Sequence, residues 1–116
     1  MYFLNPVFII GITTGPILLI TGYIMLKKPP KEINALYGYQ TKRAMESKEH
    51  WQFAQAFSSK QLIKSGFWYT LSALPFLFFE VEHITGFILC MFFLAIFVTY
   101  PIHTTEKALK EKFESK

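Results

Sequence analysis

The sequence lacks the motifs that catalysis would need and the second cysteine that covalent bracing would need. It has one cysteine, Cys90, in 116 residues, which excludes an internal disulfide. Metalloprotease, phosphate-loop and Ser/His/Asp patterns are absent, so we expect no enzyme activity. The turn Glu80–His83 holds two carboxylates and an imidazole that a divalent cation would accept. Short turns at a wet boundary also carry such groups without an ion, and we expect neither a metal nor a cofactor.

Lysine and arginine are missing from most of the chain. Eight of the twelve lie between Lys27 and Lys64, and the other four follow His103. A basic chain with net charge +4 often binds nucleic acid. Here long uncharged blocks separate the two basic segments, so we expect anionic lipid headgroups, and no nucleic acid, as the counter-charge.

What the chain has in excess is apolar residues. Hydrophobic residues make up 52% of it, including thirteen phenylalanines, more than so small a soluble domain buries. They form blocks at about residues 6–26, 62–79 and 84–102, and about 20 residues cross a hydrocarbon core of roughly 30 Å. The first block has no basic residue before it, which favours a retained helix over a cleaved leader. We therefore predict an all-α integral membrane protein, residues 1–116, with three transmembrane helices in a single domain.

The positions of the cations predict the orientation. The N-terminal residues and the turn between the second and third blocks carry no lysine or arginine. The positive-inside rule places both of these outside, and it places the loop 27–61 and the tail 103–116 in the cytoplasm.

Small residues and prolines interrupt the predicted spans. Gly11 and Gly15 form a GxxxG pair, which lets two helices approach closely. The pair indicates either packing within the chain or a dimer face. We expect Pro16 and Pro75 to kink their helices.

Two further helices are predicted on the cytoplasmic side. Residues 47–64 have a helical pattern with Ser47 as N-cap, and Trp51 and Ala54 share one face. This amphipathic helix either lies flat on the membrane or continues into the second span. The tail predicts a short helix capped by Thr104 or Thr105, which either extends the third span or lies on the inner surface.

The loop between these parts is unlike a flexible linker, which would be rich in glycine and serine. Gly38 can adopt a positive φ or admit a close backbone. Tyr37 and Tyr39 flank it, and their rings can be buried while their hydroxyls remain hydrogen-bonded. Asn34 and Thr41 add polar groups. The loop is therefore either an ordered connector or a recognition surface.

The order of these residues resembles the bacterial SdpI-like immunity family. N-A-L-Y-G-Y-Q-T is followed by A-M-E-S-K-E-H-W-Q-F-A-Q. Gln40 stands where that family usually shows arginine, and Ala44 and Gln55 replace its usual serine and asparagine. Lys42 or Arg43 supplies a nearby charge, with a different geometry. The positions that match the family pattern are Asn34, Tyr37, Gly38, Tyr39, Thr41, Met45, Trp51 and Ala54.

The resemblance implies a role as well as a fold. It implies a multi-pass protein of the bacterial cytoplasmic membrane that binds rather than catalyses and gives immunity to a secreted peptide toxin. It also implies a cytoplasmic regulator as a partner of the inner loop. The alternative is an accessory subunit of a larger membrane complex, docked through its GxxxG face and its aromatic third span.

Overall fold

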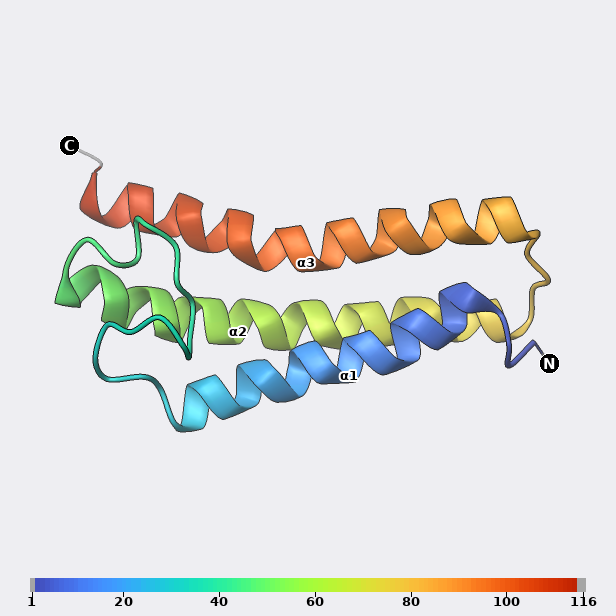
Figure 1. The fold of residues 1–116 in the computed structure, drawn as a ribbon, viewed down its shortest axis with the longest axis horizontal. Helices are drawn as coiled ribbons and strands as arrows, with labels where there is room; N and C mark the ends of the chain where they lie inside the picture. The colour runs from blue at the N-terminus through green and yellow to red at the C-terminus, as the bar shows by residue number, and fades with distance from the viewer. Residues whose placement is uncertain (1, 115–116) are drawn as a thin grey trace.

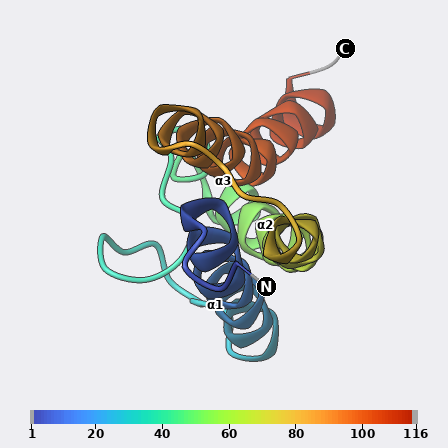
Figure 2. The same ribbon diagram turned by 90° about the vertical axis from the view of Figure 1, so that its right-hand side faces the viewer.

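The computed structural model describes residues 2–114, which form three long helices and contain no β-strand. The elements are α1 (Pro6–Lys27), α2 (Lys48–Ala73), the short 3₁₀ helix η1 (Leu74–Leu77) and α3 (His83–Phe113). The helices run side by side along the long axis, and the start of α1 and the end of α3 lie at opposite ends (Figure 1). An end-on view places them at the corners of a triangle (Figure 2).

α1 begins at a side-chain cap that also joins it to η1 and to the turn that follows η1. The Oδ1 atom of Asn5 accepts from the N–H of Val7 at 2.9 Å, which is N-cap geometry. Its Nδ2 atom donates to the carbonyls of Phe76 and Phe79 at 3.0 and 2.9 Å. One buried amide therefore fixes where the first helix starts and where the second turns back.

α1 and α2 pack through small residues. A Cβ atom on Gly15 would lie 2.8 Å from the Thr70 nitrogen and 2.9 Å from the Gly66 oxygen. One on Gly22 would lie 2.6 Å from the Ser59 oxygen, and Gly11 faces α2 in the same way. Of the two roles open to the GxxxG pair, the structure therefore shows packing within the chain.

α2 settles another alternative that the sequence left open. Ser47 caps it as predicted, and its Oγ atom accepts from the N–H of His50 at 3.1 Å. The helix then continues without a break through Ser65 and Gly66 to Ala73. The predicted 47–64 helix is therefore the first part of α2, and the loop that we placed at 27–61 is non-helical only from residue 28 to residue 47. Pro75 lies in η1 beyond the end of α2 rather than within it.

α3 is longer than the predicted third span. It passes through Pro101 and ends at Phe113, so the tail extends it instead of forming a separate helix. The prediction that Thr104 or Thr105 caps a new helix is wrong. Both hydroxyls donate to the Pro101 carbonyl one turn earlier, at 3.2 and 2.7 Å, as they do inside a helix.

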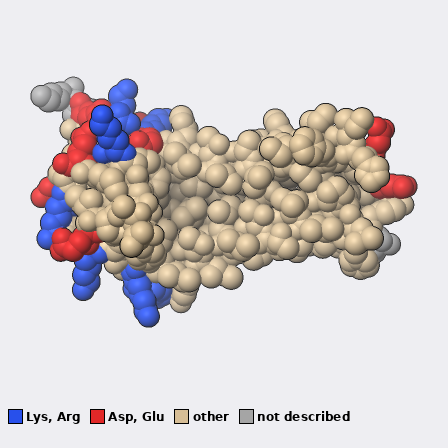
Figure 3. All heavy atoms as spheres, viewed as in Figure 1, with Lys and Arg blue, Asp and Glu red and all other residues tan. Residues whose placement is uncertain are grey.

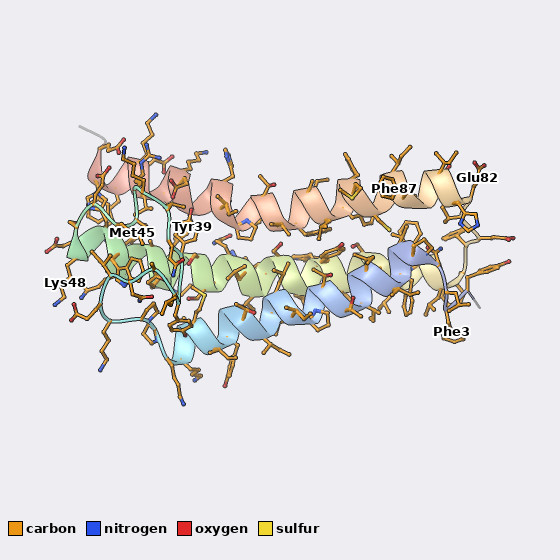
Figure 4. The ribbon with its side chains drawn as sticks, viewed as in Figure 1. Phe3, Tyr39, Met45, Lys48, Glu82 and Phe87 are labelled. Atoms are coloured by element: carbon orange, nitrogen blue, oxygen red, sulfur yellow. The ribbon has the colours of Figure 1, made fainter. Side chains whose placement is uncertain are left out.

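Among the described residues, more large hydrophobic side chains are exposed than buried. Phe87 is 66% exposed and points away from the bundle in Figure 4, whereas Ser58, Ser59 and Ser65 are buried between helices. An apolar surface of this extent is typical of a membrane or interaction surface. Among the helices of residues 2–114, α1 and α3 are long and apolar enough to cross a membrane. These two helices indicate a membrane protein. The lower apolarity of α2 reflects its serines and glutamines, many of them buried, and its lysines.

Candidate functional site

The residues that match the family pattern (the motif residues) lie at the charged end of the bundle, where residues 28–47 fold back over α2 and α3. Figure 4 labels Tyr39 and Met45 on this loop and Lys48 at the start of α2. We call the residues that fasten the loop to the two helices the loop clasp. Its members are Tyr39, Thr41, Arg43, Trp51, Gln55 and Glu106.

The first fastening holds the start of the loop. Trp51 is fully buried on α2, and its Nε1–H donates to the Pro30 carbonyl at 2.8 Å. The Tyr37 hydroxyl donates to the Lys28 carbonyl at 2.6 Å. Proline disfavours helix in the residue before it, so Pro29 and Pro30 lead the chain out of α1. Trp51 then holds the chain against α2, and Tyr37 ties the loop back to Lys28.

Asn34 organises the turn that follows. Its Oδ1 atom accepts from the N–H groups of Leu36 and Tyr37 at 2.9 and 2.7 Å, and its Nδ2 atom donates to the Glu32 carbonyl at 2.9 Å. Such side-chain turns are a common role of asparagine. The Gln40 amide is assigned from its neighbours, with its oxygen accepting from Tyr37 and Leu36 at 2.8 and 3.0 Å. At the position where the family usually has arginine, this chain therefore has a residue that braces its own turn.

Gly38 and Gln55 form a close contact between the loop and α2. Gly38 has φ = 106°, so the predicted positive φ is confirmed, and a Cβ there would lie 2.5 Å from Gln55 Oε1. The Gln55 side chain accepts from the Tyr39 N–H at 2.7 Å and donates to the Tyr39 carbonyl at 2.7 Å. It thus pairs with this peptide group much as a neighbouring β-strand would.

Glu106 joins the loop to α3. Its Oε2 atom accepts from the hydroxyls of Tyr39 and Thr41 at 2.7 and 2.9 Å, and its Oε1 atom lies 3.5 Å from Arg43 Nη1. The Nε–H of Arg43 also donates to Glu114 at 3.0 Å. Burial, and then the bond to Glu106, raises the pKa of Tyr39. The bond to Glu114 raises the pKa of Arg43.

An apolar cluster lies beneath these polar contacts. Ala44, Ala54 and Leu109 are completely buried together, which places the motif residue Ala54 in the core. The His50 ring stacks on Phe113 with centroids 3.9 Å apart. Met45 is half-buried, and its backbone N–H donates to the Thr41 carbonyl at 3.1 Å.

The structure therefore brings the predicted loop residues together, while Gly11 and Gly15 lie apart on the seam between α1 and α2. The sequence did not indicate Glu106 as their partner, because its spacing suggested a helical pair with Lys110. Gln55 was noticed only as a departure from the family pattern. The available signal for Gln55 was its i,i+4 spacing from Trp51, which places both side chains on one face of the helix.

The arrangement supports holding and binding more directly than bond-making chemistry. The polar side chains of the clasp bond to one another and to the backbone. Within residues 2–114, no three His, Cys, Asp or Glu side chains gather closely enough to hold a metal ion. The site is thus an ordered cap on the charged end of the bundle.

Comparisons with known proteins agree with the motif. The sequence profile of the SdpI/YfhL protein family matches residues 31–102, more than half of the chain. The chain is also similar to the uncharacterized protein YfhL of Bacillus subtilis (strain 168), with 38% identity over 56 residues, 48% of this chain and 51% of that protein. It thus spans about half the length of this curated relative. No solved structure matches it. The matched segment contains most of the clasp, all of α2 and most of α3. The chain therefore belongs to the SdpI/YfhL family.

Proposed function

We propose that the chain crosses the membrane three times, with α2 as the middle span. α2 runs alongside most of α1, since Gly22 of α1 contacts Ile63 and Gly11 of α1 contacts Ala73. Its outer face carries Trp68, which is 58% exposed. The bundle is 49 Å long, which exceeds a hydrocarbon core of about 30 Å and leaves length for the cap at the headgroup level. Figure 3 shows lysine and arginine only at the cap end of the visible face, acidic residues at both ends and an uncharged belt between them.

The cap faces the cytoplasm in this proposal, because cations favour the inner side. Single-cysteine labelling tests it in a Cys90→Ser background. Lys42→Cys and Lys110→Cys should react with a membrane-impermeant maleimide only after the cells are lysed, and Glu80→Cys should react in intact cells. Labelling of Lys42→Cys from outside intact cells would reverse the orientation.

We further propose that the protein gives immunity to a secreted peptide toxin by binding it without catalysis. The observation that carries this proposal is membership of the SdpI/YfhL family. The toxin would arrive at the outer end, where a cavity of about 390 Å³ is lined by residues of the N-terminal segment and of the turn before α3. Phe3 and Leu4 are 60% and 87% exposed there, and Glu80 supplies negative charge. This combination suits a cationic amphipathic peptide. The inner clasp would signal to a cytoplasmic regulator.

Complementation of a deletion strain tests immunity. The deletion should sensitise cells to a peptide made by siblings, and the wild-type gene should restore growth. Glu80→Gln combined with Glu82→Gln should restore less protection at equal membrane levels. The matched control, Glu49→Gln with Glu111→Gln at the inner end, should protect fully. A deletion strain that resists every sibling toxin as well as the wild type does would contradict the proposed immunity.

The second candidate function is an accessory subunit of a larger membrane complex. The outward face of α3 favours it, with Phe87, Met91 and Phe92 all more than half exposed. The GxxxG pair does not add a docking face, since α2 already covers it. Under this alternative, purification in a mild detergent should recover the chain in fixed ratio with one larger protein. Recovery of the chain alone would count against it.

A further inference from the structure

A cavity of about 440 Å³ lies beside the clasp, between the end of α1, the loop and the start of α2. Its apolar lining comes from Met25, Leu26, Pro29 and Ala56. Met25 and Leu26 belong to the last turn of α1, at the point where the uncharged belt ends and the cations begin. The cavity therefore opens where hydrocarbon gives way to headgroups in the proposed membrane arrangement.

The polar lining of the cavity is cationic on balance. The exposed side chains of Lys31 and Lys48 both line it, and Glu32 contributes the one carboxylate of the lining. Figure 4 shows Lys48 at the charged end of the bundle, where α2 starts. The exposed amide of Gln52 adds hydrogen-bonding groups. Two cations next to an apolar wall match a molecule with an anionic head and a hydrocarbon tail.

The clasp builds this cavity before any ligand arrives. Pro30 and Gln55 both line it, and each is held by the clasp, Pro30 through Trp51 and Gln55 through the Tyr39 peptide. A cavity with fixed walls binds without first ordering a loop, which removes an entropic cost of binding. Its volume also falls in the usual range of small-molecule sites.

We propose that this cavity binds the headgroup of one anionic phospholipid of the cytoplasmic leaflet. Lys31 and Lys48 contact the phosphate, and the first part of an acyl chain lies along Met25 and Leu26. Lysines near a membrane surface attract anionic lipids in this way. The motif loop thus acts as a lipid clamp as well as a cap. This inference rests on the proposed orientation of the bundle and is independent of immunity.

Retention of lipid by the purified protein tests the proposal. The detergent-solubilised chain is titrated with phosphatidylglycerol or phosphatidylcholine, and bound lipid is counted by native mass spectrometry. We expect one phosphatidylglycerol molecule to bind and to raise the unfolding temperature. Phosphatidylcholine should bind more weakly. Lys31→Gln combined with Lys48→Gln should lower the affinity for phosphatidylglycerol about 25-fold, roughly fivefold for each lysine. Ala56→Trp, which fills the cavity and leaves both charges in place, should also abolish tight retention.

Two control variants separate the cavity from the surface. Lys107→Gln with Lys110→Gln removes the same charge from α3 and should retain the lipid. Leu36→Trp adds the same ring in the loop at a side chain that is 97% exposed, and it should also retain the lipid. Equal weakening by both lysine pairs would overturn the proposal in favour of diffuse attraction. Displacement of the lipid by millimolar inorganic phosphate would overturn the role of the acyl chain. Failure of the toxin complementation leaves this result unaffected.

Discussion

Replacing Gln55 with leucine should release the loop from α2. Gln55 is 1% exposed, and its two hydrogen bonds to the Tyr39 peptide are both 2.7 Å long. Each such bond contributes a net 0.5–1.5 kcal/mol or so, and a buried group left without a partner costs more. Since leucine has a similar volume, packing changes little. We therefore expect Gln55→Leu to lower the free energy of unfolding by about 2 kcal/mol.

Two measurements follow this loss. Thermal unfolding in detergent should shift downward by ~8 °C, at about 4 °C per kcal/mol, and trypsin should cut faster after Lys42 in the released loop. Gln55→Glu should destabilise at least as much near neutral pH, because it sets a carboxylate oxygen against the Tyr39 carbonyl. Gln52→Leu changes an exposed glutamine of the same helix and should stay within about 0.5 kcal/mol of wild type. If Gln55→Leu behaves like Gln52→Leu, the glutamine does not hold the loop.

Three other changes test neighbouring parts of the structure. Gly38→Val should lower the free energy of unfolding by about 2 kcal/mol or more, because valine at a positive φ is strained and its Cβ meets Gln55; an unchanged unfolding temperature would contradict the tight turn. Gly15→Leu should cost about 1–3 kcal/mol by forcing α1 away from the Gly66 backbone, measured by denaturant titration. Tyr39 has a raised pKa in the folded chain, so its contribution to the free energy of unfolding is complete below about pH 10 and is lost as the pH rises further. Stability should therefore fall less steeply above that pH in Tyr39→Phe, and identical pH profiles would refute the buried phenol.

Local features of the fold were predictable because their causes lie close together in the sequence. An uncharged run that ends before Lys27, followed by Pro29 and Pro30, defines the extent of α1. Ser47 and the helical pattern after it define the start of α2. Gly38 is flanked by two tyrosines in a polar loop, a setting in which a turn with positive φ is expected. In each case a few neighbouring residues determine the conformation.

Features that depend on distant residues were not predictable in this way. Ser65 and Gly66 suggest a bend locally, yet α2 continues unbroken through them, and α1 packs tightly against Gly66 at Gly15 and Leu19. Glu106 has a lysine at helical spacing, yet it bonds to Tyr39, 67 residues away along the chain. These outcomes depend on how the helices pack, which pattern within one segment does not reveal.

The polar inner face of α2 has a consequence for biogenesis. A segment with buried serines and glutamines gains little by entering hydrocarbon alone, since each polar group there needs a partner. In the three-span arrangement, α2 therefore inserts stably only when α1 already offers its glycine seam or when α3 emerges with it as a hairpin. Integration of the middle segment is then coupled to its neighbours, and a truncated chain that ends after α2 should be recognised by quality-control proteases.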